Sequence, residues 1–397
     1  MIKRREYLNR LIKLKDKDVI KVVTGIRRCG KSVLFWQYRE YLLNIGIKQE
    51  QIISINFEDF DYYDLLDAKK LYAYIKDRLL DEEIMYIFLD EIQQVQDFER
   101  VVDSLFIKEN IDLYITGSNA YLLSSELATL LSGRYVIVEM LPISFKEYVE
   151  FLGDSSDLNQ KYKDYLLYSS FPYTLSLDND LELTHNYLEG IFNTVLLKDV
   201  VARRKISDVF MLESVIDFMF NNIGNITSTK RISDMMKSDG RKISVNTVES
   251  YLKGLIESFI LYRVNRYDIK GKQYLKTLEK YYVVDIGLRY FLLGNKNADF
   301  GHILENIIYL ELKRRGYKVN IGKINNREID FIATRLGVVE YYQVALTTRE
   351  KGTLERELRP LKNIPDHYSK ILLTLDQEPD SYYDGILKKN ALDFLLN

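Results

Sequence analysis

The chain has 397 residues, of which 47% are hydrophobic and 29% charged, with only 5 prolines. This composition excludes a disordered chain, and the length predicts two or three folded domains of about 150 residues each. Because 56 Lys and Arg nearly balance 58 Asp and Glu, a protein that coats nucleic acid or an anionic membrane over its whole surface is also excluded.

The cysteine count and the hydropathy pattern predict the cellular environment. One cysteine, Cys29, excludes a disulfide framework and a cysteine-based zinc site. No apolar run approaches the roughly 18 residues that a membrane span needs. We therefore expect a cytoplasmic protein that does not cross a membrane.

Short strands alternate with longer helices in the first 150 residues. A helix with Tyr7 and Leu11 on one side comes first. Strands are predicted at 19–24, 52–57, 84–89, 113–116 and 136–139, and helices at 32–43 and 69–80. Strands separated by helices form a parallel sheet covered on both faces, so residues 1–150 are predicted to be an α/β domain.

A glycine-rich loop follows the first predicted strand and leads into a helix. Its residues are Gly25, Ile26, Arg27, Arg28, Cys29, Gly30, Lys31 and Ser32. This is the full pattern G-x-x-x-x-G-K-S, in which backbone N–H groups and the helix N-terminus bind phosphate. We expect the loop to bind ATP, Lys31 to contact the β and γ phosphates, and Ser32 to be a ligand of Mg²⁺. Cys29 is either a redox-sensitive group or a small residue that the tight loop tolerates.

Two acids, Asp90 and Glu91, follow the buried strand at 84–89. Asp90 at the carboxyl end of a parallel strand is expected to support Mg²⁺ beside the phosphate loop. Glu91 is expected to orient and deprotonate the water that attacks the γ-phosphate. The alternative for Glu91 is an acid at a helix N-terminus, where the helix dipole stabilises it.

Two further polar sites complete the predicted ATPase machinery. Ser118 and Asn119 follow the strand at 113–116. If this strand lies beside the Asp90 strand, Ser118 or Asn119 would reach the γ-phosphate or the attacking water; ordinary turn chemistry is the alternative. Arg134 precedes the strand at 136–139. It is predicted to stabilise the γ-phosphate of a neighbouring subunit in a homo-oligomer, and the alternative is a cation at a helix C-terminus.

The sequence pattern changes after Pro142. Residues 151–222 are predicted to be a helical connector, residues 223–295 a winged-helix-like domain with Ser244 as a helix N-cap, and residues 296–397 a mixed α/β domain. Residues 227–280 carry 12 Lys or Arg against 6 acids, an excess that fits duplex DNA, although winged helices also contact proteins.

The motifs together resemble a known family. The phosphate loop, Leu89-Asp90-Glu91, Thr116-Gly-Ser-Asn, Ser132-Gly-Arg134 and the run from Leu141 to Tyr148 resemble bacterial and archaeal predicted ATPases of the AAA+ superfamily with an appended nuclease-like domain. The likeness continues through Asn246–Leu252, Tyr281–Leu288 and Leu304-Glu305-Asn306. It implies a P-loop ATPase domain, a winged-helix middle and a C-terminal domain resembling restriction endonucleases.

The C-terminal domain departs from the pattern of an active nuclease. The resemblance implies metal-binding acids at Glu305 and Asp330, an acid on the next strand and a lysine two residues further on. The sequence instead has Gln343 and Ala345 at these last two positions. We therefore expect a catalytically degenerate domain, unless Lys351 or Lys370 substitutes for the missing lysine.

The motif set predicts a Mg²⁺-dependent ATPase that couples ATP binding and hydrolysis to conformational change. The alternative is a nucleotide-regulated DNA-binding module, such as a regulator or a defence component, and an active nuclease comes last. The sequence does not indicate what the turnover of ATP drives.

Overall fold

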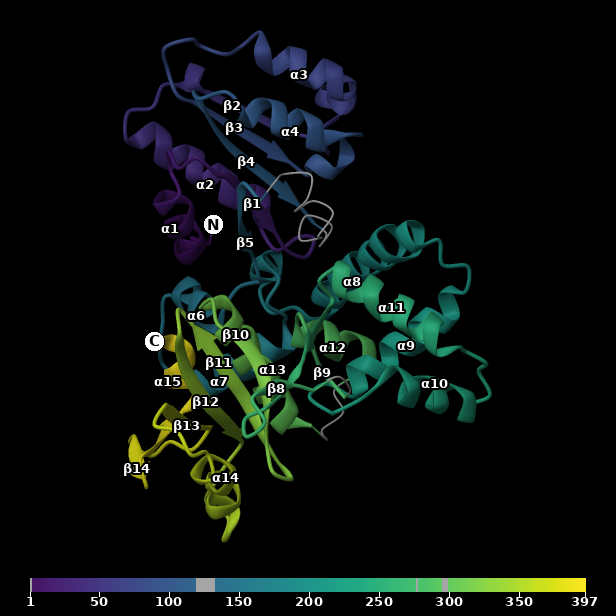
Figure 1. The fold of residues 1–397 in the computed structure, drawn as a ribbon, viewed down its shortest axis with the longest axis vertical. Helices are drawn as coiled ribbons and strands as arrows, with labels where there is room; N and C mark the ends of the chain where they lie inside the picture. The colour runs from purple at the N-terminus through teal and green to yellow at the C-terminus, as the bar shows by residue number, and fades with distance from the viewer. Residues whose placement is uncertain (1, 119–132, 276–277, 295–298) are drawn as a thin grey trace. The chain divides into compact units, whose positions relative to one another are not determined.

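The computed structural model describes residues 2–118, 133–275, 278–294 and 299–397, and the chain divides into two compact units (Figure 1). The first unit comprises residues 1–142 and 257–259, and the second comprises residues 143–256 and 260–397. The predicted boundaries at 222 and 295 lie within the second unit and remain predictions. No helix in these described ranges is both long enough and apolar enough to cross a bilayer.

The first unit contains a five-stranded sheet with the order β2-β3-β4-β1-β5, and every neighbouring pair is parallel. Its strands are β1 (Ile20–Thr24), β2 (Ile52–Asn56), β3 (Met85–Asp90), β4 (Ile111–Gly117) and β5 (Tyr135–Glu139). The α-helices among its described residues are α1 (Arg5–Lys13), α2 (Lys31–Asn44), α3 (Ala68–Lys76) and α4 (Phe98–Phe106). The predicted parallel α/β sheet is confirmed, whereas α4 was not predicted.

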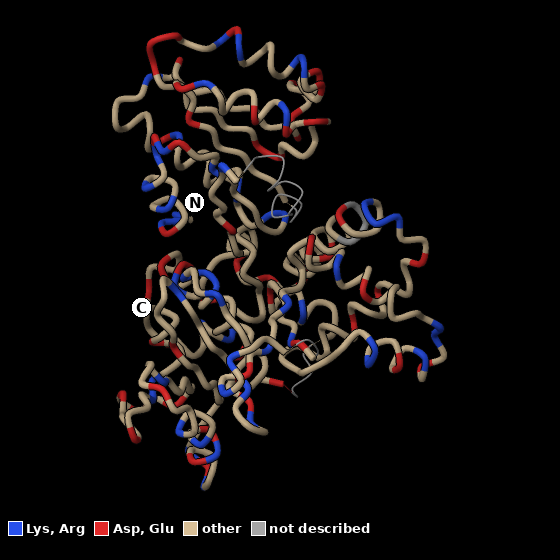
Figure 2. Tube along the Cα trace, in the orientation of Figure 1, with Lys and Arg blue, Asp and Glu red and all other residues tan. Residues whose placement is uncertain are grey.

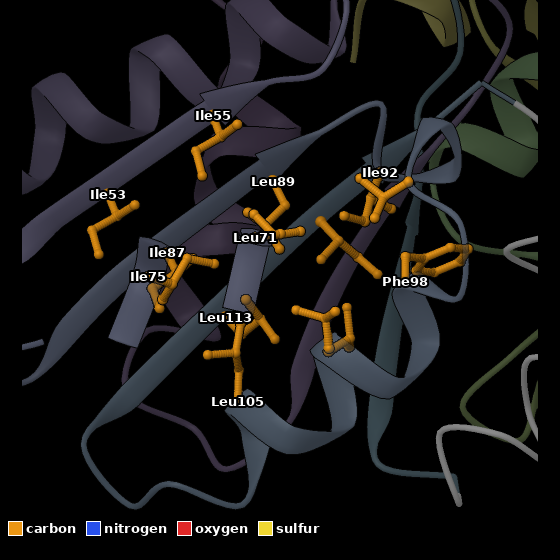
Figure 3. Close-up of a cluster of buried hydrophobic side chains, with 14 of the residues drawn as sticks. Ile53, Ile55, Leu71, Ile75, Ile87, Leu89, Ile92, Phe98, Leu105 and Leu113 are labelled. Carbon is orange, nitrogen blue, oxygen red and sulfur yellow. The ribbon is translucent and has the colours of Figure 1, made fainter. Parts of the chain in front are cut away.

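Side chains alternate along the buried strands and give the sheet two apolar faces. On one face, strand residues such as Ile87 and Leu113 pack with Leu71 of α3 and Leu105 of α4 (Figure 3). On the other face, aromatic rings of α2 cover the sheet: Phe35 lies 5.2 Å from Phe88, and Tyr38 lies 5.1 Å from Tyr114, between ring centroids. Helices on both faces leave the carboxyl edge of the sheet as the place where its loops meet.

The second unit begins with helices and ends with a large sheet. The helices are α6 (Phe145–Leu152), α7 (Leu158–Leu167), α8 (Leu181–Thr194), α9 (Val209–Asn221), α10 (Thr229–Ser238), α11 (Val245–Glu257), α12 (Ile286–Leu293), α13 (Phe300–Arg314), α14 (Thr353–Lys362) and α15 (Ala391–Leu396). A π-helical segment, Val195–Ala202, follows α8. Ser244 accepts a hydrogen bond from the amide of Thr247 at 3.1 Å, so it caps α11 as predicted.

The described residues of the second unit form two sheets. The smaller sheet consists of β6 (Leu261–Val264) paired antiparallel with β9 (Lys280–Val283). The larger sheet has the order β14-β15-β13-β12-β11-β10-β7-β8. Its strands are β7 (Arg266–Asp268), β8 (Gln273–Tyr274), β10 (Lys318–Ile324), β11 (Arg327–Arg335), β12 (Val338–Ala345), β13 (Ser369–Thr374), β14 (Ser381–Tyr383) and β15 (Ile386–Asn390).

Strands β7 and β8 of the predicted winged-helix-like domain form an antiparallel hairpin. It pairs through β7 with β10, so strands of the predicted middle and C-terminal domains share one sheet. Charged residues of both signs are interspersed along the whole chain (Figure 2). The net charge of −2 therefore arises from mixing rather than from one acidic and one basic half.

Candidate functional site

The carboxyl edge of the first sheet brings the predicted nucleotide-binding residues together. Strand β1 leads into the phosphate loop, β3 ends at Asp90, and β4 leads to Ser118. Because β4 pairs with both β1 and β3, the expected neighbourhood of the Ser118 and Asp90 strands is confirmed. The carboxyl ends of three adjacent strands, β3, β4 and β1, thus lie together at one edge of the sheet.

Backbone geometry explains the glycines of the phosphate loop. A Cβ on Gly25, whose φ is +150°, would lie 2.1 Å from the carbonyl oxygen of Met140, so only glycine fits. Gly30 has a φ of +100° and precedes the 14-residue helix α2, and no described side chain caps the N-terminus of that helix. Uncapped amides at a helix N-terminus form an anion-binding site, which fits a phosphate.

Lys31 and Glu91 form a buried ion pair at this edge. The Lys31 ammonium lies 3.3 Å from Glu91 Oε1, and the two side chains are 4% and 9% exposed. The ammonium also donates hydrogen bonds to the carbonyls of Gly25 at 3.2 Å and Ile26 at 3.4 Å. Burial opposes the charge of Lys31, but the negative groups around it raise its pKa. The lysine is therefore charged and already turned into the loop.

Glu91 is held by three polar neighbours. Ser118 Oγ donates to its carboxylate at 2.9 Å, and Gln93 Nε2 donates as well. Burial favours the neutral acid, but Lys31 and these hydrogen bonds outweigh burial and lower the pKa of Glu91. Glu91 has a φ of +56°, and its side chain does not cap the short 3-10 helix that follows. The geometry favours a carboxylate turned toward the phosphate loop over an acid at a helix N-terminus.

Asp90 lies beside Ser32 and Thr116. Thr116 Oγ1 donates to Asp90 Oδ1 and accepts a hydrogen bond from the amide of Glu91 at 2.9 Å. Burial raises the pKa of Asp90, although hydrogen bonds from Ser32 and Thr116 oppose that rise. A serine hydroxyl beside a carboxylate is a donor set that Mg²⁺ prefers, so Ser32 and Asp90 fit the predicted ion.

Sequence reasoning missed Thr116 and Gln93 as parts of this site. Thr116 was assigned to a strand and to a motif without a role of its own, yet it joins Asp90 to the amide of Glu91. A signal was present in the sequence, because a hydroxyl residue near the end of the strand beside the Asp90 strand can reach across to it. Gln93 had no such signal, since its contact depends on the left-handed turn at Glu91.

The remaining predicted residues have different surroundings. Arg27 pairs with Glu58 at 3.1 Å, and Arg28 is exposed with a φ of +65°. Cys29 is buried, and burial raises the pKa of its thiol, which favours a small structural residue over a reactive thiolate. Asn119 lies outside the described residues.

Arg134 lies at the opposite edge of the sheet from the phosphate loop. It is exposed and directly precedes β5, and its carbonyl accepts a hydrogen bond from the amide of Ile20 at the start of β1. Its guanidinium carbon is 5.9 Å from the ring centroid of Phe106. The structure therefore does not bring Arg134 to the phosphate loop of its own chain.

The acids that the resemblance implies for a nuclease surround a lysine in the second unit. Lys280 Nζ lies 2.8 Å from Glu305 Oε1 and 2.6 Å from Glu328 Oε1, and its side chain is 4% exposed. Burial opposes this charge, but Glu305, Asp330 and Glu328 raise the pKa of Lys280. Because the ammonium already lies between the carboxylates of Glu305 and Glu328, the cluster does not fit a metal ion. Within the described ranges, no group of three or more His, Cys, Asp or Glu could hold one.

The neighbouring positions are also engaged in contacts within the unit. Asp330 accepts a hydrogen bond from the amide of Val344 at 2.8 Å, and Gln343 donates to Glu357 at 3.1 Å. Lys370, a candidate for the missing lysine, donates to a backbone carbonyl at 2.9 Å, and Lys351 is exposed. The lysine that does reach these acids is Lys280, from a strand that precedes both of them.

Comparisons with known proteins agree with this fold. Residues 17–149 match a family described as an AAA domain, and residues 159–299 match a domain of unknown function (DUF8612). The Walker-type ATPase PABY2304 of Pyrococcus abyssi aligns with a TM-score of 0.50 and 17% identity, covering 74% of this chain and 96% of that one. Residues 17–149 therefore form an AAA domain with the fold of a P-loop ATPase.

Whole-chain relatives define the family. An uncharacterized protein of Haemophilus influenzae is 42% identical over 400 residues, which cover 100% of this chain and 99% of that protein. The uncharacterized protein MJ1544 of Methanocaldococcus jannaschii is 31% identical over 348 residues, covering 83% of this chain and 76% of that protein. The chain belongs to the family of these two proteins.

Proposed function

We propose that the protein hydrolyses ATP to ADP and phosphate with Mg²⁺ and uses this turnover to change conformation. The observation that carries the proposal is the buried contact between Lys31 of the phosphate loop and Glu91 at the end of β3. A loop that only binds nucleotide needs no carboxylate at this point, whereas hydrolysis needs a group that accepts a proton from water.

Each residue of the site has a role in this reaction. The Ser32 hydroxyl and Asp90 would hold Mg²⁺, which supplies positive charge against the β and γ phosphates when bound. Lys31 exchanges its contact with Glu91 for the phosphates, and Glu91 loses its cationic partner. Glu91 then orients a water molecule and takes its proton as the water oxygen bonds to the γ-phosphorus and the bond to the β–γ bridging oxygen breaks. Ser118 keeps the carboxylate turned toward that water.

Turnover of ATP by Glu91→Gln tests the proposal. The amide keeps the size of the side chain but cannot accept the proton, so kcat should fall by roughly 100- to 10,000-fold while ATP binding persists. Glu109→Gln, which changes an exposed glutamate on the other edge of the sheet, is the matched control. An undiminished rate in Glu91→Gln would remove Glu91 as the base.

Arg134 acts on a neighbouring subunit in this proposal. Its distance from its own loop, at the opposite edge of the sheet, supports a role between subunits. Arg134→Ala and Lys31→Ala should each lose most of their turnover alone, and mixing them should restore part of it because one subunit then supplies each missing group. Full activity of a monomer at low protein concentration would overturn this role.

A second candidate function is the binding of duplex DNA by residues 227–280. In this segment, exposed basic residues outnumber exposed acidic residues. Figure 2 marks the positions of the charged residues along the chain. These basic residues are Lys230, Arg231, Lys237, Lys242, Lys253, Arg263, Lys270 and Lys272. Lys280 does not contribute to such a surface, because it is buried in an ion pair.

A band shift with duplex DNA tests this second function. Binding should weaken steeply with salt, because phosphate contacts release counterions, and it should be lost when Arg241 and Lys242 are replaced by Ala. No shift at low salt would leave the winged-helix-like segment as a protein-contact module.

A further inference from the structure

The N-terminal residues before α1 contain a buried arginine that touches the nucleotide loop. Arg4 is only 2% exposed. Its Nη1 donates to the carbonyl of Cys29 at 2.8 Å, and its Nη2 donates to the carbonyl of Leu141 at 2.7 Å. One guanidinium therefore joins the middle of the phosphate loop to the segment that follows β5.

Contacts with Tyr7 and Gln37 hold Arg4 in place. Its guanidinium carbon stacks 4.9 Å from the ring centroid of Tyr7, and the Tyr7 hydroxyl accepts a hydrogen bond from the amide of Leu141 at 3.0 Å. Its backbone amide donates to Gln37 of α2 at 3.2 Å. Because α2 starts at Lys31, the same helix that presents the phosphate-binding lysine also anchors the arginine.

The loop meets the segment after β5 at two points. Gly25 packs against the carbonyl of Met140 so closely that no Cβ fits between them. Cys29 is joined to Leu141 through Arg4. With both points fixed, the peptide groups of Arg27 and Arg28 between them are restricted to the curve that turns their amides toward an anion.

We propose that Arg4 is a positioning residue for nucleotide binding: its planar fork holds the Cys29 carbonyl against Leu141 and sets the shape of the phosphate loop before ATP arrives. The proposal rests on the ATP site described above, but on binding and not on hydrolysis. A lysine cannot replace this arginine, because a single ammonium does not present two donors in the fixed geometry of a guanidinium. The positive charge alone is therefore not the function of Arg4.

Equilibrium binding of a fluorescent ATP analogue tests the proposal in the full chain. Arg4→Lys and Arg4→Ala should both weaken binding by about tenfold or more, as expected when a charge-assisted hydrogen bond is lost. When ATP hydrolysis by the same two variants is measured, KM should rise more than kcat falls, because Glu91 is unchanged. Lys3→Ala, one residue away and exposed, is the matched control and should bind as wild type does.

Chemical rescue separates positioning from a purely structural role. Guanidinium ion at millimolar concentration should restore affinity in Arg4→Ala, whereas ammonium ion should not, because only guanidinium can bridge the two carbonyls. Wild-type affinity in Arg4→Lys, or a lowered melting temperature with unchanged affinity, would overturn the proposal. Wild type that binds the analogue but does not hydrolyse ATP would contradict the proposed ATPase and leave the Arg4 measurement intact.

Discussion

Each compact unit buries a lysine against a glutamate, but the two lysines have different partners. Lys31 lies 3.3 Å from Glu91, and its other contacts are backbone carbonyls of the loop at 3.2 and 3.4 Å. Lys280 lies within 2.8 Å of two carboxylates, Glu305 and Glu328. Weak carbonyl contacts can be exchanged for phosphate, whereas two carboxylates hold an ammonium in place.

The two glutamates, Glu91 and Glu305, also differ in their other hydrogen-bond partners. Ser118 and Gln93 donate to Glu91, so this carboxylate keeps two partners when Lys31 moves to a phosphate. Glu305 Oε1 accepts from Tyr282 at 2.5 Å as well as from Lys280, on a side chain that is 7% exposed. In the proposed reaction the first pair separates, whereas the second pair stays together. A buried charge pair thus indicates a reactive site only when its partners can be replaced.

The largest effect is expected from Lys280→Met, which should lower the free energy of unfolding by about 3–5 kcal/mol because buried carboxylates lose their counter-charge. Urea unfolding measures the loss, and the exposed lysine variant Lys270→Met is the control. Adding Glu305→Gln to Lys280→Met should recover part of the loss. A change below about 1 kcal/mol would show that the cluster is not a buried ion pair.

Lys31→Ala should have the next largest effect, and it should act on function. Loss of the ammonium removes charge stabilisation at the γ-phosphate, so kcat/KM for ATP should fall by roughly 100- to 1,000-fold. The free energy of unfolding should change less than in Lys280→Met, because Glu91 keeps Ser118 and Gln93. Lys76→Ala, on the exposed surface of α3, is the control. Equal losses of stability in the two lysine variants would remove the distinction between the pairs.

The acids of the two sites should respond to pH in opposite directions. Burial and the charge of Glu305 hold the pKa of Asp330 well above its ordinary 3.8. Folding therefore binds a proton at Asp330, and wild type loses stability as the pH rises from 3.8 toward the raised pKa. Asp330→Asn removes that loss and should gain stability relative to wild type over this interval.

Glu91 has the opposite shift. Its pKa is lowered from the ordinary 4.5, so the stabilisation is complete above pH 4.5 and is lost as the pH falls through the lowered value. Glu91→Gln should therefore be less stable than wild type near neutral pH and approach it in acid. Urea unfolding of both variants from acid to neutral pH measures the two trends, and parallel curves would contradict the opposite shifts.

The sequence was sufficient to predict the positions of residues that lie at the ends of recognisable strands. The loop from Gly25 to Ser32 and the acids Asp90 and Glu91 sit at strand ends, where chain direction alone brings them to one edge of a parallel sheet. Lys280 could not be predicted, because its contact with Glu305 depends on how β9 lies against α13. Arg4 could not be predicted either, because its partner Leu141 is 137 positions away and carries the hydrogen bond on its backbone.

The smallest effect is expected at the partly exposed pair that Arg27 of the phosphate loop forms with Glu58. Arg27 Nη1 lies 3.1 Å from Glu58 Oε1, closer than Lys31 to Glu91, but the side chains are 18% and 48% exposed. Water screens this contact, so Glu58→Gln should change the free energy of unfolding by less than about 1 kcal/mol. The change should shrink further at about 1 M salt, where the Debye length is only about 3 Å.

Comparison of Glu58→Gln with Glu91→Gln at low and high salt isolates burial as the cause. The two substitutions remove the same charge from a contact with a cation of the phosphate loop, so they differ chiefly in exposure. Salt should reduce the effect of Glu58→Gln and leave that of Glu91→Gln nearly unchanged, because buried pairs are screened much less. Equal salt dependence would mean that water reaches Glu91, and a carboxylate in open water would be a poor candidate for a proton acceptor whose pKa responds to the departure of Lys31.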